Sequence, residues 1–195
     1  MAAKKVTVFC GSARGNSPAF EKATRDLALC LRKHDLELVY GGGHVGLMGV
    51  LADASLAAGV RVTGVIPQHL FEKEVAHTNL SDLIIVHSMH ERKMMMSELG
   101  DVFLALPGGF GTLDEFFEVL TWSQLGLHAK PCGLLNVDGY FDGVVDFMNN
   151  AVRYNFVPPS HRDMVLLESD PDALIDKALN YTHKIEPKWT PPAKV

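Results

Sequence analysis

The sequence predicts one doubly wound α/β domain, a Rossmann-like parallel sheet with helices on both faces. Short, continuously apolar runs alternate with longer amphipathic segments along nearly the whole chain. This alternation is typical of parallel strands that helices cover on both sides. The length of 195 residues suits a single domain. We therefore assign residues 1–183 to one domain and residues 184–195, which contain three prolines, to a C-terminal tail.

The apolar runs are the expected strands, and the amphipathic segments between them are the expected helices. The strands are expected at residues 6–10, 36–40, 60–66, 83–86, 102–106, 132–135 and 165–167. The helices are expected at residues 18–34, 47–58, 89–99, 113–125, 140–154 and 171–183. Ser17 before Pro18 and Asp170 before Pro171 mark two helix starts, because each pair combines an N-cap residue with a first-turn proline.

The charge balance argues against partners that need a basic surface. Lys and Arg number 18 and Asp and Glu number 23, which gives a formal net charge of −5. Nucleic-acid binding usually needs a strongly basic face, so we expect no nucleic acid among the partners. No apolar run reaches the roughly 18 residues of a membrane-spanning helix, and no signal-peptide core is visible. With three widely spaced cysteines, we expect a cytoplasmic protein with reduced thiols and no membrane partner.

Three glycine-rich loops follow expected strands and carry most of the functional information. They are residues 10–17 (CGSARGNS), 41–46 (GGGHVG) and 107–112 (PGGFGT). Ligands of doubly wound sheets bind beyond the carboxyl ends of the strands, and glycine lets N–H groups at a helix start approach an anion. Each loop alone could be only a tight turn, but three at one edge predict a nucleotide-phosphate pocket. The candidate loop residues are Gly11, Ser12, Gly42, Gly43 and Gly108.

Motifs for cofactors and metals are incomplete. Residues 41–46 match the G-x-G-x-x-G pattern of dinucleotide-binding proteins, but the next strand ends at residues 63–68 (TGVIPQ) without the acid that would bind the ribose. No Walker A sequence occurs. His87 and His90 have a spacing that could share a metal, but no cysteine or carboxylate cluster accompanies them. We therefore expect neither a cofactor nor a metal.

Two groups of charged residues lie beside these loops, and each has a plain structural interpretation. Residues 112–115 (TLDE) match a capping box, with Thr112 at the N-cap and Glu115 at the third helical position. A carboxylate beside an anion site is electrostatically unfavourable, so a catalytic role for Glu115 is equally open. Arg92 and Lys93 stand in the first turns of a helix, where cations oppose the helix dipole. This placement hints at function, although a solvated helix face explains it slightly better.

Three motifs in one order make the chain similar to a known family. Residues 41–49 (GGGHVGLMG), 89–93 (MHERK) and 107–115 (PGGFGTLDE) resemble the motifs of the LONELY GUY (LOG) family, and the resemblance runs from about residue 5 to 180. LOG proteins are phosphoribohydrolases that are often mislabelled as lysine decarboxylases. The resemblance implies hydrolysis of the N-glycosidic bond of cytokinin riboside 5′-monophosphates, and of AMP in some members, to free base and ribose 5-phosphate.

The resemblance also implies which residues act. Arg92 and Glu115 match the catalytic pair of the family. The positions that match substrate contacts are Glu74, Arg92, Lys93, Gly109, Phe110, Gly111, Thr112, Leu113, Asp114, Glu115 and Thr121. The implied partner is a nucleoside 5′-monophosphate, and the implied assembly is a homodimer with the active site near the subunit interface. Phe110 stands where the family often has Tyr, and Asp114 stands where Glu is common. Neither difference affects the catalytic pair, so both bear on substrate preference rather than on the type of reaction.

Three other classes of protein remain open, of which the third, an NAD oxidoreductase, is weakened by the missing acid. Related α/β proteins carry ligands such as the molybdenum cofactor with similar glycine loops, and a carrier needs the loops but not an acid aimed at a ribose. A lysine decarboxylase that depends on pyridoxal phosphate needs a lysine in a Schiff-base setting, for which the sequence gives poor support.

Overall fold

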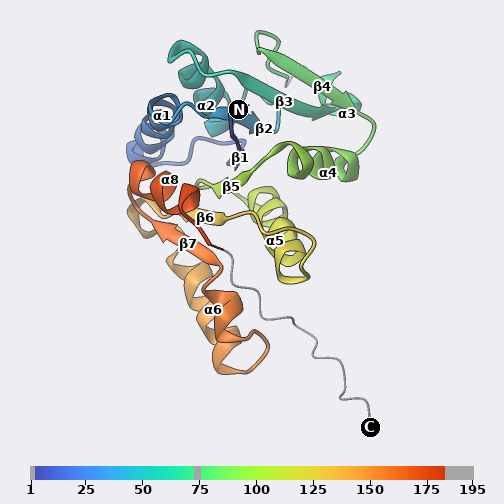
Figure 1. Cartoon of the computed structure of the whole chain (residues 1–195). Helices are drawn as coiled ribbons and strands as arrows, with labels where there is room; N and C mark the ends of the chain where they lie inside the picture. Colours follow the sequence, from blue (N-terminus) through green and yellow to red (C-terminus); the bar gives the residue numbers. More distant parts are fainter. Residues whose placement is uncertain (1–2, 73–75, 183–195) are drawn as a thin grey trace.

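The computed structural model describes residues 3–72 and 76–182, and these form one parallel sheet with helices on both faces (Figure 1). The strands are β1 (Lys5–Phe9), β2 (Glu37–Tyr40), β3 (Val62–Pro67), β4 (Asp82–Val86), β5 (Val102–Ala105), β6 (Cys132–Leu135) and β7 (Val165–Glu168). Their order is β4-β3-β2-β1-β5-β6-β7, and every neighbouring pair runs parallel. The predicted fold class is confirmed. Glu74 and the proline-containing tail lie outside the described residues.

The long helices lie where the amphipathic segments predict them. They are α1 (Pro18–Lys33), α2 (Gly46–Ala57), α4 (Met89–Leu99), α5 (Phe110–Gln124), α6 (Asp142–Arg153) and α8 (Pro171–Leu179). The sequence does not predict α3 (Gln68–Phe71), α7 (Pro159–Arg162) or the 3-10 turn η1 (Val137–Gly139), because a single turn is too short to show a helical period. Ser17 and Asp170 cap α1 and α8 as predicted. Within residues 3–72 and 76–182, no helix is long and apolar enough to cross a membrane.

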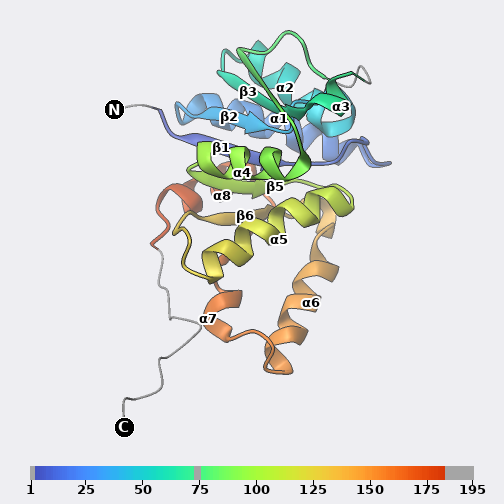
Figure 2. The same cartoon turned by 90° about the vertical axis from the view of Figure 1, so that its right-hand side faces the viewer.

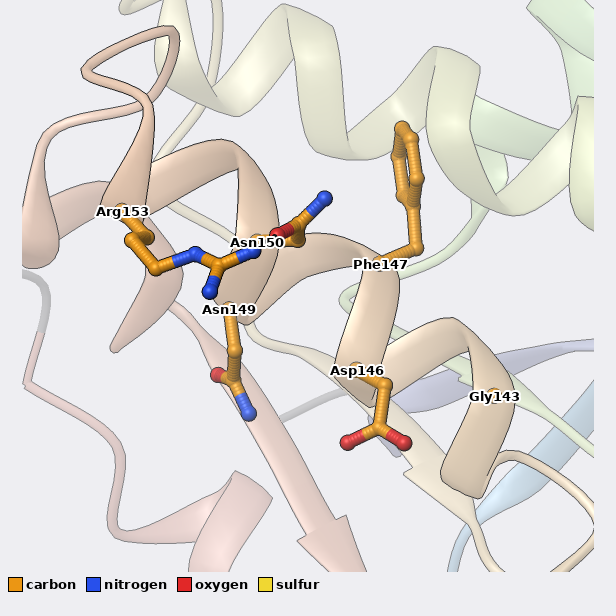
Figure 3. Close-up of a pocket in the computed structure, with 6 residues that line it drawn as sticks. All are labelled: Gly143, Asp146, Phe147, Asn149, Asn150 and Arg153. Carbon is orange, nitrogen blue, oxygen red and sulfur yellow. Dashed lines mark hydrogen bonds between the residues drawn. The ribbon is translucent and has the colours of Figure 1, made fainter.

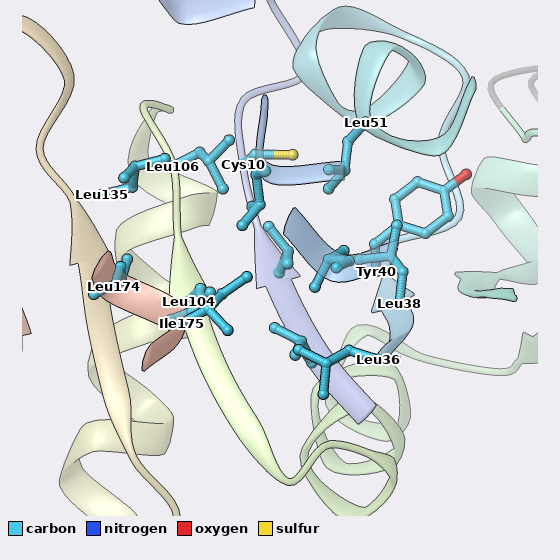
Figure 4. Packing of buried hydrophobic residues seen from close by; sticks show 14 of the residues in the cluster. Cys10, Leu36, Leu38, Tyr40, Leu51, Leu104, Leu106, Leu135, Leu174 and Ile175 are labelled. Carbon is cyan, nitrogen blue, oxygen red and sulfur yellow. The ribbon is translucent and has the colours of Figure 1, made fainter. Parts of the chain in front are cut away.

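Alternate strand residues face two separate hydrophobic clusters. Val6 and Val8 of β1 pack with residues of α1, α2 and α8 on one face of the sheet, whereas Phe9 packs with residues of α4 and α5 on the other. Figure 4 shows Leu51 of α2 and Leu174 of α8 in the first of these clusters. The two-residue period of a strand produces this division. Because both faces are apolar and covered, the edge of the sheet is where a polar ligand can reach the backbone.

The strand order brings the first and third glycine loops to the same point of the sheet. The chain runs outward from β1 through β2, β3 and β4, and then returns to pair β5 with the other side of β1. Such a reversal opens a crevice beyond the carboxyl ends of the two central strands. The N–H of Gly11 donates to the carbonyl of Pro107 at 3.0 Å, so the two loops are in direct contact there.

Helix α5 begins earlier than predicted, and the capping-box interpretation is therefore wrong. Gly109 is the N-cap residue and Phe110 the first helical residue, so Thr112 and Glu115 occupy the third and sixth helical positions. No side chain caps this helix start. The glycines at 108 and 109 let the chain turn directly into a helix, which an apolar pattern does not reveal. Glu115 consequently has no capping role.

Candidate active site

The start of α5 presents unpaired backbone donors at the sheet edge. The first helical bond at this end runs from the Leu113 N–H to the Gly109 carbonyl at 3.2 Å. The N–H groups of Phe110, Gly111 and Thr112 precede it, and a helix offers them no internal acceptor. Because no side chain caps this end and the positive end of the helix dipole lies here, the geometry suits a phosphate group.

At the second glycine loop, two of the first three N–H groups of the helix are already bonded. At the start of α2, the N–H groups of Leu47 and Met48 both donate to the carbonyl of Gly11, at 3.0 and 3.4 Å. Gly46 has a φ of +61°, and a Cβ atom there would lie 2.2 Å from the carbonyl carbon of Ser12. The Gly11 carbonyl of the first loop therefore takes the donors at the start of α2 that the second loop was predicted to offer to a ligand.

Two of the predicted loop residues, Gly42 and Gly43, are engaged elsewhere. The carbonyl of Gly42 accepts the N–H of His77 at 2.8 Å, and Gly43 forms an antiparallel bridge with Ala76. Both contacts hold the segment that precedes β4. The first and third loops remain as the candidates for binding a phosphate.

Arg92 is a buried side chain held by three separate parts of the fold. Its Nη1 donates to Glu115 Oε1 at 2.9 Å, its Nη2 to the Gly41 carbonyl at 3.0 Å and its Nε to the Val65 carbonyl at 3.1 Å. A Cβ atom at Gly41 would lie 1.8 Å from Nη2, so a glycine is required there. Arg92 is 8% exposed, and the solvated-face interpretation of this residue is therefore wrong.

Glu115 is the other member of this buried pair. It is 8% exposed and projects from the second turn of α5 toward Arg92. Burial raises the pKa of the Glu115 carboxyl above its ordinary value of 4.5, and the charge of Arg92 opposes that rise. The result is a carboxylate with little surrounding water, fixed in place by a cation that is itself fixed by backbone carbonyls.

Lys93, next to Arg92, has different surroundings. Its Nζ lies 3.1 Å from both Asp114 Oδ2 and Glu118 Oε1. Burial acts to lower the pKa of Lys93, but hydrogen bonds to the two carboxylates outweigh it and raise that pKa. Lys93 therefore stays a protonated cation beside the site.

A cleft of about 430 Å³ brings these groups together. The volume falls in the range typical of small-molecule sites. Of the residues that the sequence predicts for the site, the cleft is lined by Ser12, Arg92, Gly109, Phe110, Gly111, Thr112, Asp114 and Glu115. Gly11 and Gly108 line an adjoining hollow of about 250 Å³ between the first and third loops. Leu113 and Thr121 line a shallow surface beside α5 instead.

Sequence reasoning missed the apolar part of the cleft. The remaining lining residues are Cys10, Met48, Leu70 and Met89. Nothing in a sequence distinguishes such side chains from ordinary core residues, because both are apolar and follow the same periods. Burial raises the pKa of the Cys10 thiol strongly, so this cysteine stays protonated and contributes bulk rather than a nucleophile.

One cluster has the composition of a metal site but the hydrogen bonds of a structural one. Within the described part of the chain, His44, Asp53 and His77 hold ligand-type atoms within 4.8 Å of one another. The Nδ1 atom of His77 accepts the N–H of Asn79 at 3.3 Å, and Nε2 lies 3.0 Å from Asp53 Oδ1. An accepting Nδ1 places the ring proton on Nε2, where it is donated to Asp53 rather than replaced by a metal. We assign this cluster to the anchoring of the loop before β4.

The fold and the cleft place the chain in a class of Rossmann-like proteins whose ligand site lies at the switch point of the sheet. The family model described as "Possible lysine decarboxylase" matches residues 48–178. The chain is 47% identical over 178 residues to a probable cytokinin riboside 5′-monophosphate phosphoribohydrolase of Oryza sativa subsp. japonica, covering 91% of this chain and 78% of the relative. It is 46% identical over 173 residues to a cytokinin riboside 5′-monophosphate phosphoribohydrolase of Rhodococcoides fascians, covering 88% and 87%. The chain thus belongs to the LONELY GUY family.

Solved structures confirm the fold at lower sequence identity. The molybdenum cofactor carrier protein of Chlamydomonas reinhardtii superposes with a TM-score of 0.71 at 18% identity, covering 92% of this chain and all of that one. The molybdenum cofactor binding protein of Rippkaea orientalis gives a TM-score of 0.68 at 21% identity, covering 90% and 95%. These likenesses concern the arrangement of the sheet and helices alone.

Proposed function

We propose that the protein hydrolyses the N-glycosidic bond of nucleoside 5′-monophosphates of the cytokinin riboside type, releasing the free base and ribose 5-phosphate. The observation that carries this proposal is the buried Arg92–Glu115 pair in a cleft bordered by the uncapped start of α5. The printed names of the relatives from Oryza sativa and Rhodococcoides fascians describe the same reaction.

The helix geometry supports a substrate that spans the two parts of the cleft. Glu115 lies five residues beyond Phe110, about 7.5 Å along the axis at 1.5 Å per residue. A ribose 5-phosphate group can bridge that separation, with its phosphate on the N–H groups at the helix start and C1′ near the carboxylate. Binding of the phosphate then positions a bond that lies several ångströms away.

The chemistry follows from the charge of the carboxylate. Cleavage of the bond between C1′ and the base nitrogen develops positive charge on the ribose, as in glycoside hydrolysis. Glu115 stabilises that charge and orients a water molecule, while Arg92 favours the ionised form of Glu115. The water oxygen bonds to C1′, the bond to nitrogen breaks, and a proton from the water ends on the departing base.

A direct assay tests this proposal. Purified protein is incubated with isopentenyladenosine 5′-monophosphate and with AMP, each beside its dephosphorylated riboside, and base release is followed by HPLC. We expect base from the monophosphates and little from the ribosides. No base from any substrate would favour a carrier without hydrolase activity, and equal turnover of riboside and monophosphate would contradict the role of the phosphate.

The pH dependence of the reaction reports on Glu115. Because burial raises its pKa above 4.5, we expect kcat/KM to fall as the pH drops through that raised value, with the acid limb above 4.5. Circular dichroism at each pH separates this titration from unfolding. An acid limb at or below 4.5, with the protein folded throughout, would show that the reaction does not depend on this carboxylate.

Lys93 and Lys130 do not fit the chemistry of a decarboxylase that uses pyridoxal phosphate. A Schiff base forms from a neutral amine, whereas two carboxylates keep Lys93 protonated. Lys130, whose pKa burial lowers, donates to the Ser97 carbonyl at 2.7 Å just before β6. It therefore lies at the amino ends of the strands, opposite the cleft.

The same proposal includes a homodimer that forms through α5 and α6. Helix α6 extends away from the sheet (Figures 1 and 2) and buries only Met148 among its residues. Phe147 is 64% and Phe110 95% exposed. Asp146, Asn149, Asn150 and Arg153 line the same shallow surface of α6 as Phe147, and in Figure 3 Phe147 and Asp146 project in different directions from the helix. Thr121 lines the shallow surface beside α5 rather than the cleft, so contact between Thr121 and a substrate would need a second subunit.

Sedimentation analysis tests the dimer. We expect the protein to sediment as a dimer at micromolar concentration, and Phe147→Asp to shift it toward the monomer with unchanged circular dichroism, because a buried unpaired charge opposes association. Leu29→Asp, the same kind of change at a 61% exposed apolar residue of α1, on the other face of the sheet, serves as the control. A wild-type protein that sediments as a monomer would contradict this part of the proposal.

A further inference from the structure

We propose that Tyr140 is a positioning residue, whose hydroxyl fixes the orientation of the peptide bond between Gly108 and Gly109. Tyr140 follows η1, far from the glycine motifs in sequence, and its Oη donates to the carbonyl of Gly108 at 2.5 Å. This inference rests on the proposed function, since it concerns the loop that would hold the 5′-phosphate.

The ring of Tyr140 is itself held by aromatic neighbours. It packs edge-on against Phe20 of α1 with ring centroids 5.6 Å apart, and against Phe141 at 5.1 Å. Edge-to-face pairs at such distances are favourable. Although Tyr140 is 44% exposed, its hydroxyl therefore has a defined place above the loop.

The hydrogen bond from Tyr140 restrains the peptide bond between Gly108 and Gly109, which has few other restraints. A Cβ atom at Gly108 would lie 2.1 Å from Thr112 Oγ1 and 2.7 Å from the Gly11 nitrogen, so the Cα of Gly108 is tightly enclosed. A Cβ atom at Gly109 would meet nothing within 4 Å. Glycine populates many backbone conformations, and the peptide between these two glycines can rotate unless its carbonyl is bound.

The carbonyl direction decides where the next N–H group points. In a planar trans peptide the C=O and the following N–H point in opposite directions. With the Gly108 carbonyl turned to Tyr140, the Gly109 N–H points away from Tyr140, and Gly109 is the N-cap residue of α5. A rotated peptide would instead present a carbonyl oxygen to the phosphate and repel it.

Tyr140 stands apart from the reacting atoms. It lines the hollow between the first and third loops, whereas Arg92 and Glu115 line the neighbouring cleft. Loss of its hydroxyl should therefore weaken the binding of phosphate-bearing ligands and leave the chemical step nearly unchanged.

Tyr140→Phe tests this inference, because it removes the hydroxyl and keeps the ring packing. We expect KM for isopentenyladenosine 5′-monophosphate to rise about three- to tenfold, with kcat nearly unchanged. This range corresponds to the free energy that one hydrogen bond typically contributes to binding. The turnover of the riboside should stay the same. Tyr154→Phe is the control, since it removes the hydroxyl of another exposed tyrosine that packs on Arg153. An unchanged KM, or an equal loss for riboside and monophosphate, would overturn the inference.

A binding measurement separates this inference from the proposed reaction. Calorimetry with ribose 5-phosphate needs no turnover, and we expect Tyr140→Phe to weaken its binding by the same factor. If the wild type binds ribose 5-phosphate but hydrolyses none of the substrates, the proposed hydrolase activity is contradicted. The role of Tyr140 in phosphate binding is then tested by calorimetry alone. Equal affinity in wild type and variant, or no binding by the wild type, would overturn the role of Tyr140.

Discussion

Replacement of Glu115 by Gln is expected to lower kcat/KM for the monophosphate by about 10²- to 10⁴-fold, the range for loss of a catalytic acid–base or charge-stabilising group. The amide keeps the shape of the side chain and an oxygen for Arg92 Nη1, so the cleft should keep its form. What disappears is the negative charge that would face the ribose. Steady-state assays with isopentenyladenosine 5′-monophosphate measure the effect.

Glu118→Gln is the matched control for this change. Glu118 lies one turn further along α5, pairs with Lys93 at 3.1 Å and is not among the residues that line the cleft. The same chemical change there should leave kcat nearly unaltered. Retained activity in Glu115→Gln would mean that the buried pair serves only the stability of the fold.

Arg92→Met should have the largest effect on stability. It leaves Glu115 buried without a counter-charge and removes the donors that the Gly41 and Val65 carbonyls use. Breaking one side of a buried ion pair costs about 3–5 kcal/mol, so we expect a fall of that size in the free energy of unfolding measured with urea at neutral pH. The deficit should shrink as the pH falls through the raised pKa of Glu115, because the protonated carboxyl needs no partner.

Two further variants isolate the cause of that loss. Arg92→Met combined with Glu115→Gln should recover part of the stability, since no unpaired charge remains, but none of the activity. Lys93→Met removes a cation whose partners Asp114 and Glu118 are 63% and 27% exposed in their side chains. It should cost about 1 kcal/mol, well below the loss in Arg92→Met, because solvent screens both pairs. A double variant no more stable than Arg92→Met alone would show that the carboxylate charge is not the source of the loss.

The fold was predictable because apolar periodicity is a local property that survives into the structure. The central strands β1 and β5 are almost wholly buried, and apart from Lys5 and Thr7 of β1 their residues are apolar. The start of α5 was not predictable in the same way. Residues 112–115 match a capping pattern by sequence, but a glycine pair with no side chains starts the helix three residues earlier.

The site was predictable in its glycine loops and charged residues, but not in its geometry. Nothing local to Arg92 indicates burial, because its acceptors come from β3, the end of β2 and α5, which only the folded sheet brings together. Met48 and Met89 stand within the matched motifs, but neither they nor Leu70 were predicted to line the site, since an apolar cleft wall resembles a core. The position of Tyr140 above the third loop depends on β6 lying next to β5, a long-range pairing.

The measurement that tests the central claim most directly is ³¹P NMR of the wild-type reaction with isopentenyladenosine 5′-monophosphate, with HPLC of the base in parallel. Hydrolysis at the N-glycosidic bond predicts one ribose 5-phosphate for each free base, with no inorganic phosphate, and product formation slowed by at least about 10²-fold with Glu115→Gln. Inorganic phosphate together with intact riboside, or an unchanged substrate signal with folded wild-type protein, would contradict the account.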